Sequence, residues 1–350
     1  MTAISFTTLL LALGIGTTLT FVSSHWLLAW MGLEISTLAI LPLMAQHHHP
    51  RAVEAATKYF LVQATAAAVL LFASTTNAWI SGHWDIQQTS HPLPLTLVTL
   101  ALALKIGLAP LHSWQPEVLQ GLTMNTGVIL ATWQKLAPFA ILAQIQTPNS
   151  LLLIMLGVTS IFIGGWGGLN QTQLRKVLAY SSIAHLGWMI LVLQYSYPLT
   201  LLALLLYIVV TYATFTMFTI QTVSSMKMLF ALGTKNPVLT TLLPLLLLSL
   251  ASLPPLTGFL AKLLILKELT KQGLTTTAAL AIMGTLLSAF FYIRLSVATT
   301  LTLAPNITTG TTTWRLLSSR LTMPLSISAM LAIALLPLTP ALLALFAYWF

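Results

Sequence analysis

The sequence predicts an all-α, polytopic membrane protein with eleven transmembrane helices. Hydrophobic residues make up 57% of the 350 residues and charged residues only 5%, whereas a soluble domain carries about 25% charged residues. Apolar stretches of about 20 residues, the length at which a helix spans a bilayer, follow one another along the whole chain. In two of these stretches, 95–122 and 238–268, a lysine and a neighbouring proline at membrane depth indicate an interrupted helix.

The expected spans are joined by short connections, and no extramembrane domain is expected. The longest connection, at about 295–322, is polar and rich in threonine. Nine spans are expected to be continuous, and two are expected to be broken, at 95–122 and 238–268. In chain order the spans are 3–22, 26–45, 57–79, 95–122, 124–143, 150–169, 177–194, 199–221, 238–268, 274–294 and 323–346.

Eleven spans divide the loop charges unevenly between the two sides of the membrane. The side of the N-terminus receives two glutamates and nine basic residues, and the other side receives two acidic and two basic residues. Missing one span would mix the two sides, so the bias supports this count. By the positive-inside rule, the N-terminus lies in the cytoplasm or its equivalent compartment and the C-terminus lies opposite. The nine basic residues are Arg51, Lys58, Arg175, Lys176, Lys227, Lys235, Arg294, Arg315 and Arg320.

The stretch 95–122 carries a charge and a helix breaker in the same span. Lys105 lies near its middle, and an intramembrane ammonium costs about 2.5–3.5 kcal/mol on insertion scales, so it is expected to face protein or water. Pro110 lacks an N–H and is expected to break the helix, with His112 just beyond the break. This combination indicates an ion pathway, although a kinked helix with an ion-paired lysine is the alternative.

The pattern of 95–122 returns in the second half of the chain. In 238–268, Lys262 follows Pro254 and Pro255, so the order of charge and break is reversed. The reversal is expected if two five-helix units cross the membrane in opposite directions, as in transporters with inverted repeats. We therefore predict repeats at 1–145 and 146–295, each with a broken fourth helix. Residues 296–350 then form a loop and a C-terminal transmembrane helix.

Further titratable side chains are expected inside the membrane. Glu34 and Lys135 each lie near the middle of a span, where a charged group is functional by default. We hypothesise a proton-transferring chain of Glu34, Lys105, Lys135 and Lys262, linked by water and polar groups. A static ion pair, above all between Glu34 and Lys105, is the alternative reading.

Two histidines are candidates for an accessory role in the same pathway. His112 follows the first break, and His185 lies in span 177–194. An imidazole can relay protons through its two ring nitrogens. A hydrogen-bonded packing role is the alternative for both.

Several other classes of site are excluded or disfavoured. The chain has no cysteine, which excludes disulfides and thiolate-bound iron–sulfur clusters. His47, His48 and His49 are adjacent and lack the spacing of a helical metal site, so we expect no metal. The basic residues are scattered, which argues against nucleic acid. The glycine-rich segment 164–168 has no preceding strand, and close helix packing explains it better than a phosphate loop.

Three segments of the chain resemble one family. KIGLAPLHSWQPEVLQG, LNQTQLRKVLAYSSIAHLGWM and LASLPPLTGFLAK, in this order, resemble the antiporter-like membrane subunits of respiratory complex I and of multisubunit sodium/proton antiporters. The resemblance covers roughly residues 23 to 290. It implies that Glu34, Lys105, Lys135 and Lys262 are the family's proton-translocating residues and that His112 and His185 lie on the same polar axis.

The resemblance also implies a setting for the chain. It indicates a multi-pass subunit of the mitochondrial inner membrane, with its N-terminus on the matrix side and its C-terminus on the intermembrane-space side. Its partners would be other membrane-arm subunits, including further antiporter-like chains, and lipids such as cardiolipin. NADH, FMN, iron–sulfur clusters and ubiquinone would bind to other subunits, and none of them to this chain.

The expected function follows from the family. The chain would move protons from the matrix to the intermembrane space, coupled to NADH oxidation and ubiquinone reduction elsewhere in an NADH:ubiquinone reductase. A sodium/proton antiporter-type subunit and a structural spacer that pumps nothing are the two alternatives.

Overall fold

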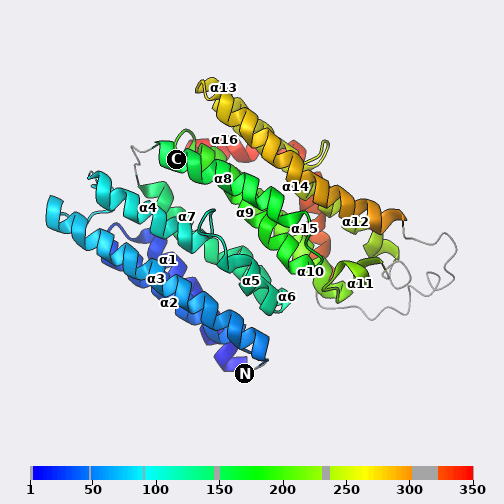
Figure 1. Cartoon of the computed structure of the whole chain (residues 1–350), viewed down its shortest axis with the longest axis horizontal. Coiled ribbons are helices and arrows are strands. Elements are labelled where there is room, and N and C mark those ends of the chain that lie inside the picture. The colour runs from blue at the N-terminus through cyan, green and yellow to red at the C-terminus, as the bar shows by residue number, and fades with distance from the viewer. Residues whose placement is uncertain are drawn as a thin grey trace. The chain divides into compact units, whose positions relative to one another are not determined.

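The computed structural model describes residues 3–46, 49–89, 91–145, 150–230, 237–301 and 322–349, and every element named in these ranges is helical. The chain divides into two compact units, Met1–Leu156 and Gly157–Phe350. Figure 1 shows the helices of each unit packed as long rods. The all-α fold predicted from the sequence is confirmed. The predicted inverted relationship between two repeats, with a boundary at 145/146, stays a prediction.

The first unit is a bundle whose broken members lie against long helices. The helices α1 and α2 contact one another, and α2 contacts α3 (Figure 1). The elements are α1 (Ala3–Val22), α2 (Trp26–Met44), α3 (Pro50–Ser81), α4 (Pro92–Ile106), α5 (Trp114–Gly121), α6 (Met124–Ala131), α7 (Trp133–Gln144) and the start of α8 (Ser150–Gly168).

Helix α3 is longer than the predicted span 57–79 at its N-terminal end. Pro50 is the first helical residue, where its missing N–H costs no hydrogen bond. The His49 ring nitrogen Nδ1 accepts a hydrogen bond from the Arg51 N–H and so caps the helix. At the other end, Gly82 adopts a left-handed conformation with φ of 74° and terminates the helix. Local capping therefore extends the helix beyond its apolar run.

Close approach of glycines fixes the packing of α1 on α2. A Cβ atom added to Gly16 would lie 2.8 Å from the Gly32 carbonyl oxygen and 2.9 Å from the Ser36 nitrogen. The two backbones thus touch directly, as membrane helices do where small residues face one another. This contact sets the position of α2, the helix that carries Glu34.

In the second unit, α9 and α10 have largely buried side chains and so form its centre. The predicted span 238–268 is interrupted between α12 and α13. After α8, the elements are α9 (Leu174–Val192), α10 (Tyr197–Gln221), α11 (Met226–Phe230), α12 (Pro237–Ala251), α13 (Thr257–Lys271), α14 (Thr275–Leu301), α15 (Thr322–Ala334), the 3₁₀-helix η3 (Leu336–Leu338) and α16 (Thr339–Trp349).

The glycine-rich end of α8 packs closely against its neighbours, as predicted. A Cβ atom on Gly164 would lie 2.6 Å from the Ala184 nitrogen of α9, and one on Gly165 would lie 2.8 Å from the Gly284 oxygen of α14. Because neither position has room for a side chain, these glycines bring three helices into backbone contact.

The predicted C-terminal span 323–346 is not one straight helix. Two segments, Thr322–Ala334 and Leu336–Tyr348, meet at an angle of 66°. Pro337 and Pro340 lie at the junction, and each removes a backbone donor from a continuing helix. The loop predicted before this span falls mainly at 302–321, outside the described residues.

Among the residues that the structure describes, seven helices are long and apolar enough to cross a membrane, and the bent C-terminal pair makes an eighth candidate. The predicted spans 95–122 and 238–268 are each divided between two shorter helices, and 177–194 forms the more polar α9. The protein is therefore a multi-pass membrane protein, while the count of eleven spans stays a prediction.

Candidate functional site

Lys105 lies one residue from the end of α4, directly before an irregular segment. The helix ends at Gly107, which has φ of 87°, and the N–H groups of Gly107 and Leu108 both donate to the Ala103 carbonyl. The break was expected at Pro110, three residues later. The position is wrong because the glycine terminates the helix first by adopting a conformation that other residues avoid.

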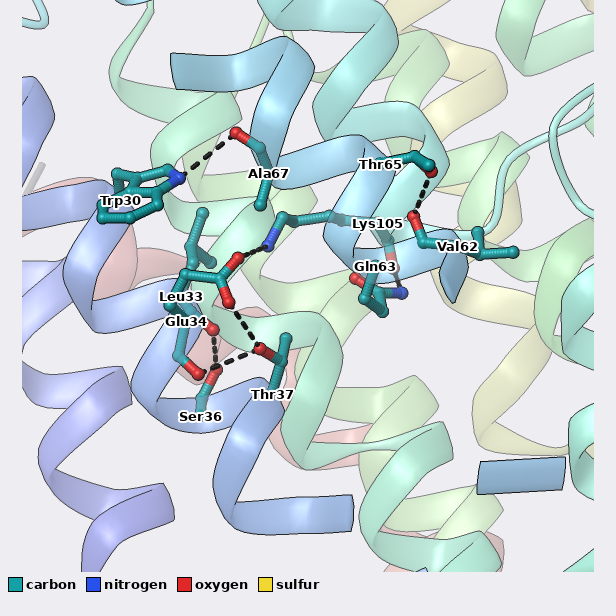
Figure 2. A network of polar contacts seen from close by, with 10 residues as sticks. All are labelled: Trp30, Leu33, Glu34, Ser36, Thr37, Val62, Gln63, Thr65, Ala67 and Lys105. Carbon is teal, nitrogen blue, oxygen red and sulfur yellow. Dashed lines mark hydrogen bonds and ion pairs between the residues drawn. The ribbon is translucent and has the colours of Figure 1, made fainter. Parts of the chain in front are cut away.

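Lys105 and Glu34 form an ion pair across the interface of α4 and α2. Their Nζ and Oε1 atoms are 3.9 Å apart, with side-chain exposures of 1% for Lys105 and 22% for Glu34. Within the described residues, neither of these two atoms makes a hydrogen bond. The Thr37 hydroxyl lies 3.4 Å from the other carboxylate oxygen, Oε2, and donates to it. Figure 2 shows the ammonium and the carboxylate pointing toward one another.

The two facing atoms of this pair lack close hydrogen-bond contacts in the part of the chain that the structure describes. A buried ammonium without hydrogen-bond acceptors at close range is costly, and water or another polar group is the usual remedy. The pair is thus an ion pair at a long separation for such a contact, and it lacks the short, hydrogen-bonded geometry of a strong salt bridge.

Lys135 lines the same cavity as Lys105. The centre of a water molecule could occupy a volume of about 10 Å³ in this cavity. This is enough space for about one water. Lys135 is 4% exposed. The other polar residues that line the cavity are Ser36, Thr37, Tyr59, Gln63, Trp114 and Gln134. The structure therefore brings Glu34, Lys105 and Lys135 together in the first unit.

The helix of Lys135 is interrupted shortly before the lysine, although the span 124–143 was predicted to be continuous. Helices α6 and α7 are separated at Thr132, whose hydroxyl donates to the Val128 carbonyl. Pro138 cannot donate to the carbonyl of Gln134 and loosens the preceding turn. The irregular turn places Lys135 in the first turn of α7.

Lys262 occupies a separate cavity in the second unit. Its ammonium nitrogen lies 5.9 Å from the centre of the Trp188 ring, near the limit of a cation–π contact. The cavity leaves about 30 Å³ open to the centre of a water molecule, and His185, Tyr207 and Ser249 also line it. Lys262 and His185 thus line one cavity, while the predicted chain from Lys135 to Lys262 stays a prediction.

The rings of His185 and Tyr207 also approach each other. Their centroids are 5.8 Å apart. Because both side chains face the Lys262 cavity, His185 has a polar environment beyond simple apolar packing. Its predicted relay role stays a prediction.

His112 lies in the irregular segment between α4 and α5. Its ring nitrogen Nδ1 is 3.2 Å from the Pro110 carbonyl, within the break after α4. The described residues that line the Lys105 cavity do not include it. A relay through His112 therefore stays a prediction, and its observed contact is local.

Sequence reasoning missed Gln63, Gln134, Tyr59 and Tyr207, which line the two cavities. Each is a polar or amphipathic residue within an apolar helix. The signal that could have found Gln63 is its isolation in the run Phe60–Leu71, where a buried amide needs a partner.

The structure gives no indication of a metal centre in the described ranges, where no three His, Cys, Asp or Glu residues lie close enough to hold an ion. His47 and His48 lie outside the described residues. His49 acts as the cap of α3.

Residues 23–288 match the family described as NADH:quinone oxidoreductase/Mrp antiporter, transmembrane region. The chain belongs to this family. Residues 289–343 match a second family, NADH dehydrogenase subunit 2 C-terminus. Both matches together account for nearly all of the described helices, so the family assignment covers both units.

Curated relatives in this family extend over almost the full chain. It is 64% identical to NADH-ubiquinone oxidoreductase chain 2 of Tetraodon nigroviridis over 338 residues, which is 97% of each chain. It is 58% identical to the protein of the same name from Danio rerio, with 96% of this chain and 97% of the relative covered.

Chains of solved membrane complexes share the fold. A chain of respiratory complex I from Thermus thermophilus with bound aureothin superimposes with a TM-score of 0.85 at 29% identity, covering 97% of this chain and 79% of that chain. A chain of the Mrp complex from Dietzia has a TM-score of 0.74 at 17% identity, covering 97% and 74%. At 17% identity, the likeness to the Mrp chain shows a shared fold and nothing more.

Proposed function

We propose that this protein is a proton-translocating core subunit of the membrane arm of NADH–ubiquinone oxidoreductase. The observation that carries the proposal is the arrangement of Glu34, Lys105 and Lys135 in the first unit. Two of these are joined by a loose ion pair, and both lysines line one cavity of water size. Full-length relatives named NADH-ubiquinone oxidoreductase chain 2 support the assignment to this complex.

The proposed mechanism uses changes of charge. The redox reaction of NADH and ubiquinone, on other subunits, alters the field at Glu34 and so changes its affinity for Lys105. Released from its carboxylate, Lys105 passes a proton through the cavity toward Lys135. Lys262, with His185 beside its own cavity, takes part in transfer in the second unit, and His112 is an accessory relay. A proton affinity set by a neighbouring charge is the physical basis of each step.

The setting follows from the same assignment. In this proposal the chain lies in the mitochondrial inner membrane, with its N-terminus in the matrix and its C-terminus in the intermembrane space; the bias of loop charges supports this orientation. Its partners are other membrane-arm subunits, antiporter-like chains among them, and membrane lipids. FMN, iron–sulfur clusters, NADH and ubiquinone are assigned to other subunits.

The proposal is tested by Lys105→Met in the assembled complex, because methionine keeps much of the length of the side chain and removes its proton-binding group. Proton translocation and NADH oxidation are measured in inner-membrane vesicles, per assembled complex. We expect fewer protons per electron pair. Lys58→Met is the matched control, since Lys58 is exposed and paired with Glu54 and Glu117, and it should leave the ratio unchanged.

The result also separates the alternatives. A Lys105→Met complex that keeps its full proton stoichiometry would contradict the proposal and favour a structural spacer. Removing sodium from the vesicles tests the remaining alternative: if charge movement in the native complex then stops, the chain is a sodium/proton antiporter-type subunit.

A further inference from the structure

Four neutral side chains connect the helices that carry the titratable residues of the first unit. Each donates an N–H hydrogen bond from a side chain on one helix to a backbone carbonyl of another. The bonds are Trp30 to Ala67 (3.2 Å), Gln63 to Lys105 (3.3 Å), Trp114 to Leu104 (3.1 Å) and Gln134 to Ser36 (3.0 Å). Two of these, from Trp30 and Gln63, are drawn in Figure 2.

Gln63 satisfies a carbonyl that the broken helix leaves without a helical partner. Helix α4 ends at Ile106, so the carbonyls of its last turn lack the N–H groups that a longer helix would supply. The Lys105 carbonyl accepts from Gln63 Nε2, and the Leu104 carbonyl accepts from Trp114 Nε1. Gln63 is 3% exposed, so its side chain is buried away from bulk solvent. The backbone of Lys105 is thereby held against α3.

Gln134 makes another bond between helices, beside the second lysine. It directly precedes Lys135 on α7 and donates to the Ser36 carbonyl, which lies two residues after Glu34 on α2. Trp30 connects α2 in turn to α3. The helices of Lys135, Glu34 and Lys105 are therefore joined in series by α7–α2, α2–α3 and α3–α4 bonds.

These bonds differ from the Lys105–Glu34 contact in how they respond to protons. A glutamine amide and an indole N–H keep their hydrogens at physiological pH, so their hydrogen bonds do not depend on the charge of a neighbour. The 3.9 Å contact between Lys105 and Glu34 depends on both charges. The neutral bonds can thus hold the helices in place while the titratable groups change state.

We propose that Gln63 and Gln134 are positioning residues of the proton-transferring site. They fix the separation of Glu34, Lys105 and Lys135 through bonds that do not titrate, and both also line the cavity between the lysines. This inference rests on the function proposed above.

The test replaces each glutamine by methionine, which has a similar length and cannot donate, and compares the complexes with the native one. We expect Gln63→Met and Gln134→Met to lower proton translocation by about two- to tenfold per assembled complex, the range that one lost hydrogen bond gives. The pH at which translocation is half-maximal should move by about half to one unit. Gln144→Met is the matched control, because Gln144 donates to the Phe21 carbonyl at 3.5 Å, between α7 and α1, and does not line the cavity.

The outcomes are distinguishable from failure of the proposed function. If Lys105→Met abolishes pumping while both glutamine variants keep the native rate and pH midpoint, the positioning role is wrong and the function stands. If Lys105→Met also pumps normally, the function itself is wrong. A purely structural role for the glutamines would reduce the amount of assembled complex in both variants without moving the pH midpoint, and would overturn the inference, while the control should keep the native rate and pH midpoint.

Discussion

The ammonium of Lys262 faces the ring of Trp188 at 5.9 Å, whereas the ammonium of Lys105 faces the carboxylate of Glu34 at 3.9 Å. The two lysines beside the broken helices therefore meet partners of different chemistry. A carboxylate can take up a proton and lose its attraction for the lysine. An aromatic ring cannot, so its attraction for the protonated lysine is constant.

The contact between Lys262 and Trp188 predicts a graded series. Trp188→Phe should weaken the ammonium site slightly, and Trp188→Leu should weaken it by about 1 kcal/mol, because tryptophan has the strongest cation–π attraction and leucine has none. We expect proton translocation per assembled complex to fall in the order Trp, Phe, Leu. Trp166→Leu is the control, since Trp166 is 74% exposed. Equal rates in Phe and Leu variants would contradict a role for the ring.

Glu34→Gln should separate electron transfer from proton movement. Glutamine keeps the shape of the side chain and removes the charge that attracts Lys105, leaving a buried ammonium without its counter-charge. Because Glu34 is partly exposed, we expect a cost of about 1–2 kcal/mol, seen as a roughly tenfold slower translocation in vesicles. Glu54→Gln, which changes an exposed ion pair on α3, should leave the rate near its native value. Native pumping by Glu34→Gln would mean that the ion pair takes no part.

Glycine substitutions test how the end of α4 is built. Gly107→Ala should destabilise the assembled complex most, because φ is 87° and the added Cβ would lie 2.5 Å from Gln115 Oε1. Gly82→Ala has a comparable φ of 74° but open space, so it should cost about 1–2 kcal/mol from the backbone alone. Gly14→Ala, with ordinary φ and open space inside α1, should not destabilise and should stabilise slightly, because alanine favours a helix more than glycine does. Thermal unfolding of the complex gives the order, and a Gly107→Ala complex as stable as Gly14→Ala would refute this account.

The buried charges could be predicted because a charged residue within an apolar span is recognised from its immediate sequence neighbours, and its free-energy cost in the membrane is known. A lysine inside an apolar run, as at Lys105, has to be buried in protein or water whatever its partners are. The sequence also predicted that 95–122 would be interrupted. It placed the end of the helix at Pro110 because proline is the strongest breaker, although the left-handed Gly107 stops the helix earlier.

The partners of the charges could not be predicted in the same way. The bonds from Gln63 to Lys105 and from Gln134 to Ser36 join residues 42 and 98 positions apart. Helical periodicity carries no information about such contacts, since they depend on which faces of different helices meet. The irregularity at Thr132 beside Lys135 was also missed, whereas the glycine packing of 164–168, a local composition signal, was predicted.

The backbone contacts of α8 limit how the second unit can move. Helix α8 contacts α9 at Gly164 and α14 at Gly165, and at both places no side chain lies between the backbones that could change rotamer to accommodate a movement. Turning α8 about its own axis by one residue, about 100°, would drive a bulky neighbour such as Trp166 into one of these tight crossings. Any rotation or translation of helices during turnover is therefore expected to leave α8 in place and to involve other helices of the unit.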